Sequence, residues 1–234
     1  MPDLETCSPD LSSPPELTQA EQASEKPIQI VKQRTPRWKR SFDVVSSLIL
    51  LILLAPLLLA LGLYIKLVSK GPVLYIQPRV GFGGETFRIM KFRTMHDRKQ
   101  MRDEVHREYV ANLAANNEVL EKPDIKSELI LGGGLLRALS VDELPQLWNV
   151  LKGEMSLVGP RPDLLELEDY TEEQLRRFEV LPGITGLWQV NDKNDLTFTD
   201  MIDLDIEYID TRTLLLDIKI LFGTAFGMLK LSNS

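Results

Sequence analysis

One segment of the chain, Val44 to Ile65, contains 22 residues and no charged side chain. As an α-helix it would be about 33 Å long, which is enough to cross the hydrocarbon core of a bilayer. A helix buried inside a soluble protein is rarely apolar on every side, so this segment predicts contact with a membrane. It begins beyond residue 40 and is too long to be the apolar core of a cleaved signal peptide.

Pro56 lies in the middle of this segment. A proline inside a helix removes one backbone hydrogen bond and kinks the axis. Basic residues flank both ends, so the positive-inside rule gives no clear orientation: Arg37, Lys39 and Arg40 precede the segment, and Lys66 and Lys70 follow it. If both ends prefer the cytoplasmic face, a helix bent at Pro56 could enter and leave the membrane on that face. The alternative is a single span that tolerates a proline, and these residues leave both arrangements open.

The composition changes sharply before the membrane segment. Residues 1–30 contain six acidic side chains and one lysine, which is the composition of a disordered tail. Residues 31–40 contain five basic side chains and no acid. Cys7 is the only cysteine, which excludes an intrachain disulfide or a cysteine metal cluster. The two histidines, His96 and His106, lie in a charged run and do not indicate a serine–histidine–aspartate site.

Beyond the membrane segment, the pattern predicts strands and helices together. Residues 72–80 and 86–95 are expected to form a hairpin joined by the glycine-rich residues 81–85. A polar helix is expected at 97–120 and a short amphipathic helix after residue 143. A strand-like run from residue 156 is expected to lead into a Gly-Pro-Arg-Pro turn, and residues 182–190 to form a rigid turn. An apolar helix at 211–231 is expected to lie against the membrane or the core. Residues 66–99 contain eight Lys or Arg side chains against two acids. These charges fit either anionic lipid headgroups or a site for a phosphorylated ligand.

Two adjacent acids, Asp142 and Glu143, precede the short amphipathic helix. Ser140 and Glu143 match the Ser-x-x-Glu capping box. Alternatively, Asp142 is itself the N-cap, which would place Pro145 in the first helical turn. Acids at a helix start are ordinary, because the helix dipole favours them by roughly 0.3–1 kcal/mol. The other interpretation is that one acid is a reagent, and the surrounding sequence has to decide between the two.

Arg161 stands between two prolines in the Gly-Pro-Arg-Pro turn. Proline fixes its own φ angle, offers no N–H and restricts the residue before it, so Arg161 has few backbone options. Such stiffness suits a guanidinium that grips a phosphate with two parallel hydrogen bonds. A plain surface turn would have the same composition.

Three longer runs carry more information: KFRTM at residues 91–95, SVDELPQLWNVLKGEMSLVGPRPD at 140–163 and PGITGLWQV at 182–190. In this order and spacing, after a proline-broken apolar segment, they resemble the bacterial sugar transferases. These are the monotopic phosphoglycosyl transferases that act on polyprenyl phosphate. The resemblance runs from about Trp38 to Lys230, and the short architecture resembles the minimal members of the family.

The resemblance implies an enzyme that transfers a sugar-1-phosphate from a UDP-sugar to undecaprenyl phosphate and releases UMP, through a covalent aspartyl-phosphosugar intermediate. It implies Mg²⁺ as cofactor. The implied partners are a UDP-sugar, undecaprenyl phosphate and membrane lipid, with no nucleic acid, and a homodimer is left open. The implied location is the bacterial inner (cytoplasmic) membrane, with the catalytic domain on the cytoplasmic face. The implied process is the first membrane step in assembling an exopolysaccharide, capsule, O-antigen or glycoprotein glycan.

The resemblance also implies roles for individual residues. Asp142 corresponds to the nucleophile and Mg²⁺ ligand, and Glu143 to its neighbour in a catalytic dyad. The implied phosphate- or nucleotide-binding residues are Arg137, Arg161, Pro162, Lys91 and Arg93. A carboxylate is a competent nucleophile towards phosphorus, and its attack on a charged pyrophosphate needs a divalent cation and arginines to offset repulsion. The resemblance therefore favours a reagent at Asp142, which can also sit at a helix N-terminus.

The expected fold is a mainly helical α+β protein. It contains a disordered tail at residues 1–36 and a re-entrant membrane helix with basic flanks at 37–70. The helix is expected to break at Ala55-Pro56, which corresponds to the family's Ser-Pro break; Ala55 replaces the serine, so the break depends on Pro56 alone. A membrane-associated, mainly helical catalytic domain with a small β-hairpin follows at 71–234. The rival hypothesis is a non-catalytic membrane scaffold of a polysaccharide assembly complex, in which the acids serve only as caps. A scaffold has no reason to combine the two acids with Arg137 and Arg161.

Overall fold

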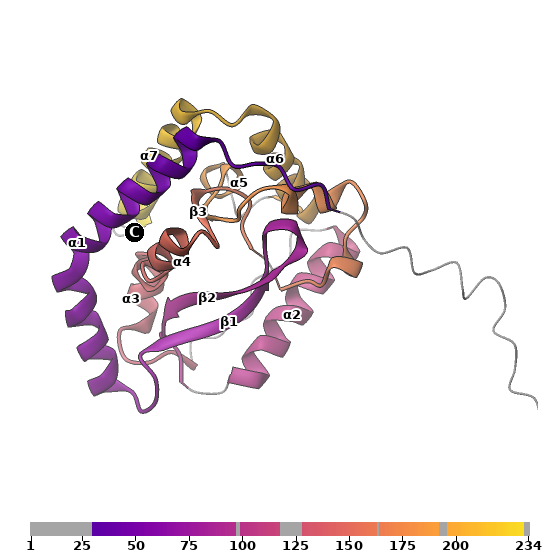
Figure 1. The fold of residues 1–234 in the computed structure, drawn as a ribbon. Helices are drawn as coiled ribbons and strands as arrows, with labels where there is room; N and C mark the ends of the chain where they lie inside the picture. Colours follow the sequence, from indigo (N-terminus) through magenta and orange to yellow (C-terminus); the bar gives the residue numbers. More distant parts are fainter. Residues whose placement is uncertain (1–29, 97–98, 118–127, 163, 192–195, 232–234) are drawn as a thin grey trace, which may run out of the picture.

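The computed structural model describes residues 30–96, 99–117, 128–162, 164–191 and 196–231. These residues form a mainly helical α+β fold with two small sheets, which confirms the predicted fold class at that level (Figure 1). The expected tail lies outside the described residues as far as residue 29. Residues 30–36 are extended and lie against the body, where the Gln33 N–H donates to the Glu179 carbonyl at 2.8 Å.

In chain order the elements are α1 (Arg37–Val68), β1 (Leu74–Val80), η2 (Phe82–Gly84), β2 (Thr86–Phe92), α2 (Lys99–Asn116), α3 (Gly133–Ala138), η4 (Val141–Glu143), α4 (Gln146–Lys152), β3 (Ser156–Val158), η5 (Leu167–Asp169), η6 (Gln174–Glu179), β4 (Gly183–Thr185), α5 (Leu187–Val190), α6 (Phe198–Thr211) and α7 (Leu214–Leu231).

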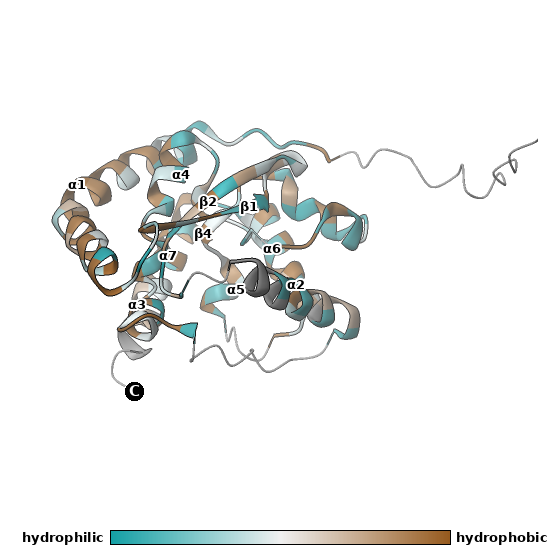
Figure 2. Ribbon diagram, turned by 90° about the horizontal axis from the view of Figure 1, so that it is seen from below, coloured by the Kyte–Doolittle hydropathy of each residue, from teal (hydrophilic) through white to brown (hydrophobic). Residues whose placement is uncertain are grey.

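Within the part of the chain that the structure describes, α1 is the one helix long and apolar enough to cross a membrane. It is continuous through Pro56, and both Figure 1 and Figure 2 show its axis changing direction between its two halves. Apolar side chains cover its outward side, and Leu53 and Leu59 are 71% and 76% exposed. Figure 2 shows hydrophobic residues along most of its length. An apolar surface of this extent marks α1 as the membrane-associating element.

Both ends of α1 are attached to the same globular body. Near its start, the Arg40 guanidinium donates to the carbonyls of Val150 and Leu151 at 2.7 and 2.9 Å. Near its end, the Tyr64 hydroxyl donates to the Leu131 carbonyl at 2.8 Å. The first and last turns of a 32-residue helix are therefore held by one body.

A buried polar cluster anchors the start of α1 on α7 and β3. The Lys39 ammonium and the Asp217 carboxylate lie 2.7 Å apart, with their side chains 4% and 0% exposed. The Tyr208 hydroxyl donates to Asp217 at 2.8 Å, and the Leu157 N–H donates to Asp43 at 3.1 Å. Removing one partner of a buried ion pair leaves an uncompensated charge, which costs about 3–5 kcal/mol. This pair therefore makes the position of α1 on the body specific.

The expected hairpin is confirmed. β1 and β2 pair antiparallel, with Val80 opposite Thr86 at the turn and Leu74 opposite Phe92 at the open end. Gly83 and Gly84 have φ angles of 66° and 77°, a left-handed conformation that glycine adopts without steric cost. The glycine-rich sequence is thus explained by the shape of the turn.

The second sheet brings two distant motifs together. β3 and β4 pair in parallel, with Ser156 opposite Gly183 and Val158 opposite Thr185. Residues 182–190, expected as a rigid turn, contain the strand β4 and the short helix α5. A Cβ on Gly183 would lie 2.1 Å from the backbone nitrogen of Gly159. The two segments approach this closely only because both glycines lack side chains. Their contact supports the turn that follows β3.

The C-terminal part of the fold contains one element that was not expected. α6 begins with a capping box, in which the Thr197 hydroxyl accepts from the Asp200 N–H at 3.2 Å and the Asp200 carboxylate accepts from the Thr197 N–H at 2.9 Å. α7 matches the expected apolar helix: it buries Ile220, while Phe222 and Phe226 are 73% and 61% exposed. α2 occupies the described part of the expected polar helix.

The main hydrophobic core joins the hairpin to the helices and strands around the acidic dyad. It includes Ile89 of β2, Val150 of α4, Val158 of β3, Tyr208 of α6 and Ile220 of α7. Each fully buried Val or Ile contributes about 1.5–3 kcal/mol relative to exposure. The core therefore fixes the elements that carry the site relative to one another.

Candidate active site

Asp142 and Glu143 lie on η4, a single turn between α3 and α4, and neither capping interpretation is correct. Ser140 has a φ angle of 52° and makes no side-chain capping bond. α4 begins at Gln146 after Pro145, again without a side-chain cap, so Asp142 is not its N-cap. An N-cap residue normally has an extended backbone, and the backbone of Ser140 is left-handed. Neither acid therefore takes part in a side-chain cap of η4 or α4.

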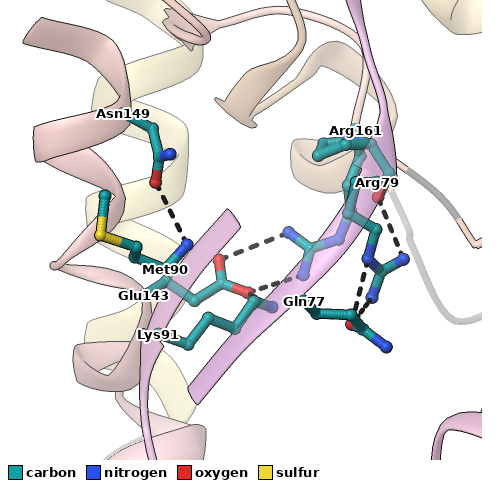
Figure 3. A network of polar contacts seen from close by, with 8 residues as sticks. Gln77, Arg79, Met90, Lys91, Glu143, Asn149 and Arg161 are labelled. Carbon is teal, nitrogen blue, oxygen red and sulfur yellow. Dashed lines mark hydrogen bonds and ion pairs between the residues drawn. The ribbon is translucent and has the colours of Figure 1, made fainter. Parts of the chain in front are cut away.

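Glu143 is held by two cations from different parts of the chain (Figure 3). Its Oε1 lies 2.8 Å from Lys91 Nζ on β2 and 2.7 Å from Arg161 Nη2. Arg161 Nη1 adds a longer contact to Oε2 at 3.4 Å. Burial would raise the pKa of Glu143, but Arg161 and Lys91 outweigh burial and hold it well below its usual range. Glu143 is therefore a fixed negative charge between two positive ones.

Asp142 is in a different electrostatic state from its neighbour. Its side chain makes no hydrogen bond or ion pair with any residue that the structure describes. Burial raises its pKa, the charge of Glu143 raises it further, and the more distant charges of Lys91, Arg137 and Arg161 lower it. Asp142 is therefore the carboxylate of the pair that is open to a ligand, and it is more basic than an ordinary aspartate.

Lys91 is positioned by the hairpin and by α4. Asn149 of α4 is fully buried and binds the β2 backbone, donating to the Arg88 carbonyl at 2.8 Å and accepting from the Met90 N–H at 3.2 Å (Figure 3). Burial lowers the pKa of Lys91, and Arg161 and Arg79 lower it further, while Glu143 raises it. Asn149 fixes the strand that carries Lys91 against the helix that follows Glu143, and sequence reasoning did not identify it.

Arg161 projects from a turn that is braced on both sides. The Gly159 N–H donates to the Thr185 carbonyl at 2.9 Å, and the Gly183 N–H donates to the Pro160 carbonyl at 2.8 Å. Pro162 is buried, and its carbonyl accepts a long contact from Arg79 at 3.5 Å. The turn is thus held to β4 by one backbone hydrogen bond that it donates and one that it accepts, although its prolines have no N–H to donate.

The other expected phosphate-binding residues are not part of this cluster. Arg137 is exposed at the end of α3, and its guanidinium contacts the Met95 sulfur at 3.1 Å. Arg93 is buried, and it donates to the carbonyls of Lys70 and Ser69 at 2.8 and 3.0 Å, just beyond the end of α1. Arg137 still acts on Asp142 through its charge, whereas Arg93 secures the chain that leaves α1.

Gln77 and Arg79 on β1 are further polar residues that sequence reasoning missed. They are two residues apart, so they share one face of the strand. Gln77 Oε1 accepts from Arg79 Nη2 at 2.8 Å, and Figure 3 places both beside Arg161. The available signal in the sequence was the polar pair at alternate positions of an expected strand; the structure shows that Gln77 and Arg79 are buried while Ile76 and Pro78 are exposed.

The residues present fit a magnesium ion that is shared with a substrate. Within the described ranges, no group of three His, Cys, Asp or Glu side chains lies close enough to hold a metal by itself. Mg²⁺ at phosphate-transfer sites usually keeps several waters and is held by one or two carboxylates plus substrate phosphates. No described residue pairs with the Asp142 oxygens, so one of them could bind the ion while the other stays free. The donor set therefore suits a substrate-bridged ion and does not suit an all-protein cage.

Taken with the membrane helix, this geometry describes a membrane-associated enzyme with two carboxylates in unlike states. Residues 33–231 match the family model for bacterial sugar transferases, and the chain belongs to this family. The exopolysaccharide production protein ExoY of Sinorhizobium fredii (strain NBRC 101917 / NGR234) is 42% identical over 193 residues, covering 80% of this chain and 83% of ExoY. The enzyme class is therefore that of a sugar transferase.

Other relatives have more specific names. The UDP-glucose:undecaprenyl-phosphate glucose-1-phosphate transferase of Caulobacter vibrioides is 42% identical over 205 residues, covering 84% of this chain and 71% of that protein. The undecaprenyl-phosphate galactose phosphotransferase of Salmonella typhimurium is 40% identical over 205 residues, covering 86% of this chain but 42% of that protein. The matched region thus covers 83% of ExoY but less than half of the longer Salmonella protein.

Proposed function

We propose that this protein transfers a sugar-1-phosphate from a UDP-sugar to undecaprenyl phosphate and releases UMP, as a membrane step of polysaccharide synthesis. The observation that carries the proposal is the contrast within the dyad: Glu143 is locked between Lys91 and Arg161, and Asp142 has no partner among the described residues. The names of two relatives that act with undecaprenyl phosphate support the same reaction. The catalytic unit is assigned to residues 71–234.

In the first step, an Asp142 carboxylate oxygen attacks the β-phosphorus of the UDP-sugar. An oxygen–phosphorus bond forms, the bond from the β-phosphorus to the bridging oxygen breaks, and UMP leaves with the electron pair. Asp142 is suited to this attack because burial and the adjacent Glu143 charge raise its pKa, and a more basic carboxylate is a better nucleophile. The product is an acyl phosphate, which is labile enough to pass the group on.

In the second step, a phosphate oxygen of undecaprenyl phosphate attacks the same phosphorus. The acyl-phosphate bond breaks, the Asp142 carboxylate is regenerated, and a polyprenyl diphosphate sugar is formed. Lys91 and Arg161 lie beside the dyad with N–H groups that phosphate oxygens can share. Preorganised cations of this kind stabilise the charge that gathers on the transferred phosphoryl group.

Mg²⁺ is the proposed cofactor. Asp142 would hold it together with the donor's phosphates, and the bound ion would offset negative charge on the pyrophosphate. Glu143 is less available as a ligand, since its Oε1 is already shared between Lys91 and Arg161.

We also infer that α1 enters and leaves the membrane on one face. A helix of 32 residues is about 48 Å long, and a single span would place its ends on opposite sides of the bilayer. The contacts of Arg40 and Tyr64 attach both ends to one body, which supports a helix bent at Ala55-Pro56. The proposed location is the bacterial inner membrane, with the body on the cytoplasmic face, where nucleotide sugars are available.

The decisive experiment is a UMP-release assay on the purified protein with Mg²⁺, undecaprenyl phosphate and a panel of UDP-sugars. The relatives' names make UDP-glucose and UDP-galactose the first donors to test. Release of UMP with one donor, abolished by Asp142→Asn, is the expected result. No release with any donor would favour the scaffold hypothesis.

A further inference from the structure

The backbone of Arg161 depends on side chains outside its own turn. Pro160 and Pro162 have no N–H groups, so the turn cannot form its own hydrogen-bond pattern. The Pro160 carbonyl accepts from the Gly183 N–H, as described above. The next carbonyl, that of Arg161 itself, accepts from Arg177 Nη2 at 2.8 Å. Arg177 is therefore in direct contact with the backbone from which the Arg161 guanidinium extends.

Arg177, on η6, is itself firmly held. Its side chain is 4% exposed, and Nη2 also donates to the Asp205 carboxylate of α6 at 2.9 Å, in a pair whose Asp205 partner is 1% exposed. Nη1 donates to the Tyr170 hydroxyl at 3.2 Å. The guanidinium also lies 5.6 Å from the Tyr170 ring centre and 5.9 Å from that of Phe178. A planar guanidinium can make these bonds and ring contacts together, and a lysine cannot.

We propose that Arg177 is a positioning residue for the transfer reaction: by holding the Arg161 carbonyl against the α6 core, it aims the Arg161 guanidinium at the site of the donor phosphates. The inference rests on the proposed function, because it concerns how Arg161 meets a diphosphate. The Arg177–Asp205 pair would suffice to hold η6 on α6. The additional bond to the Arg161 carbonyl links that buried pair to the active site, and Arg161 and Arg177 line one small crevice.

The test is a double-mutant cycle between Arg177→Lys and Arg161→Ala, with UDP as the probe. UDP carries both phosphates of the donor and has no sugar to transfer, so its affinity can be measured by calorimetry without turnover. Hydrogen bonds between a guanidinium and phosphate oxygens are charge-assisted and depend on how the guanidinium is oriented. We therefore expect Arg177→Lys to weaken UDP binding, and to raise the KM for the UDP-sugar, by about tenfold or more.

In the Arg161→Ala background, Arg177→Lys should change either quantity by less than about twofold, because the group that it positions is gone. Equal losses in both backgrounds would overturn the proposal, since a general structural defect does not depend on Arg161. The control is Arg176→Lys: this neighbour is 36% exposed and pairs with Asp210 at 2.6 Å, and it should leave UDP binding unchanged.

A second variant covers the case in which Arg177→Lys does not fold. Replacing the pair together, as Arg177→Met with Asp205→Leu, removes both charges of this buried pair, a change that is often neutral for stability. We expect this variant to fold and still to lose about tenfold in UDP affinity, because the Arg161 carbonyl has lost its donor. A folded variant with wild-type affinity would overturn the proposal. Coupling in UDP binding with no UMP release from any donor would support the positioning role and contradict the transfer reaction.

Discussion

Arg161 and Glu143, 18 residues apart in the chain, form a two-point ion pair with contacts of 2.7 and 3.4 Å. This pair explains two sequence features at once. The prolines around Arg161 restrict the backbone that carries its guanidinium. Glu143, the second acid of the dyad, accepts the hydrogen bonds of that guanidinium. Glu143 is thereby occupied, whereas Asp142 beside it pairs with no residue that the structure describes.

Arg161→Lys is expected to reduce kcat/KM by roughly tenfold or more, because lysine keeps the charge but loses the planar fork that makes two contacts. The measurement is steady-state UMP release. Arg107→Lys is the matched control, since Arg107 belongs to an exposed pair with Glu166 at 3.7 Å. Wild-type turnover in Arg161→Lys would contradict the phosphate-grip role.

Asp142→Asn is expected to abolish turnover while leaving the thermal unfolding midpoint nearly unchanged. An amide cannot attack phosphorus, and no described residue loses a bond when the carboxylate is replaced. Incubating the wild-type protein with the UDP-sugar alone should give a phosphosugar adduct on the peptide that contains Asp142, detected by mass spectrometry. An adduct on Glu143, or turnover by Asp142→Asn, would show that the nucleophile is assigned wrongly.

Lys39→Met is expected to destabilise the fold by about 3–5 kcal/mol, because Asp217 would be left as a buried, uncompensated charge. Chemical denaturation in a detergent or nanodisc preparation measures this loss. The paired replacement Lys39→Met with Asp217→Leu should recover most of the stability. If the single variant is as stable as the wild type, the pair does not anchor α1.

Gly183→Ala is expected to disrupt the contact between β3 and β4 and to reduce both stability and turnover. Its Cβ would lie 2.1 Å from the backbone nitrogen of Gly159 and 2.4 Å from the carbonyl oxygen of Thr185, and backbone atoms cannot move aside cheaply. Gly227→Ala in α7 is the control, because no described atom beyond its chain neighbours and the adjacent backbone of its own helix lies within 4 Å of the position that its methyl group would take. There the change should stabilise slightly, by roughly 0.5–1 kcal/mol. Equal behaviour of the two variants would contradict the close approach.

Cysteines introduced at positions 36 and 70, in a chain with Cys7 replaced by serine, are expected to react with an impermeant reagent from the same side of the membrane. The reason is that both ends of α1 bind one body. The measurement is labelling in intact and inverted vesicles. Labelling from opposite sides would establish a single span.

Several features of the fold follow from short-range patterns in the chain. The uncharged run at Val44–Ile65 predicts a membrane helix, the glycine-rich residues 81–85 predict a hairpin turn, and the apolar run before the C-terminus predicts α7. These patterns succeed because backbone sterics and apolar spacing act over a few residues. α6 was missed although its Thr-x-x-Asp start has the same local character.

The active site depends on contacts between residues that are distant in the chain. Lys91 meets Glu143 across 52 residues and Arg177 meets the Arg161 carbonyl across 16, and no local pattern specifies which cation approaches which acid. The prediction of a capping box at Ser140 was wrong for a related reason. The sequence motif is present, but the backbone of Ser140 adopts a left-handed conformation between α3 and η4, and a capping box does not form in that geometry. Residue type and motif predicted Asp142 and Glu143 as the candidate reactive pair. The unlike charge states of the two acids arise from burial and from the cations that the packing of the hairpin, η4 and the arginine turn places around them.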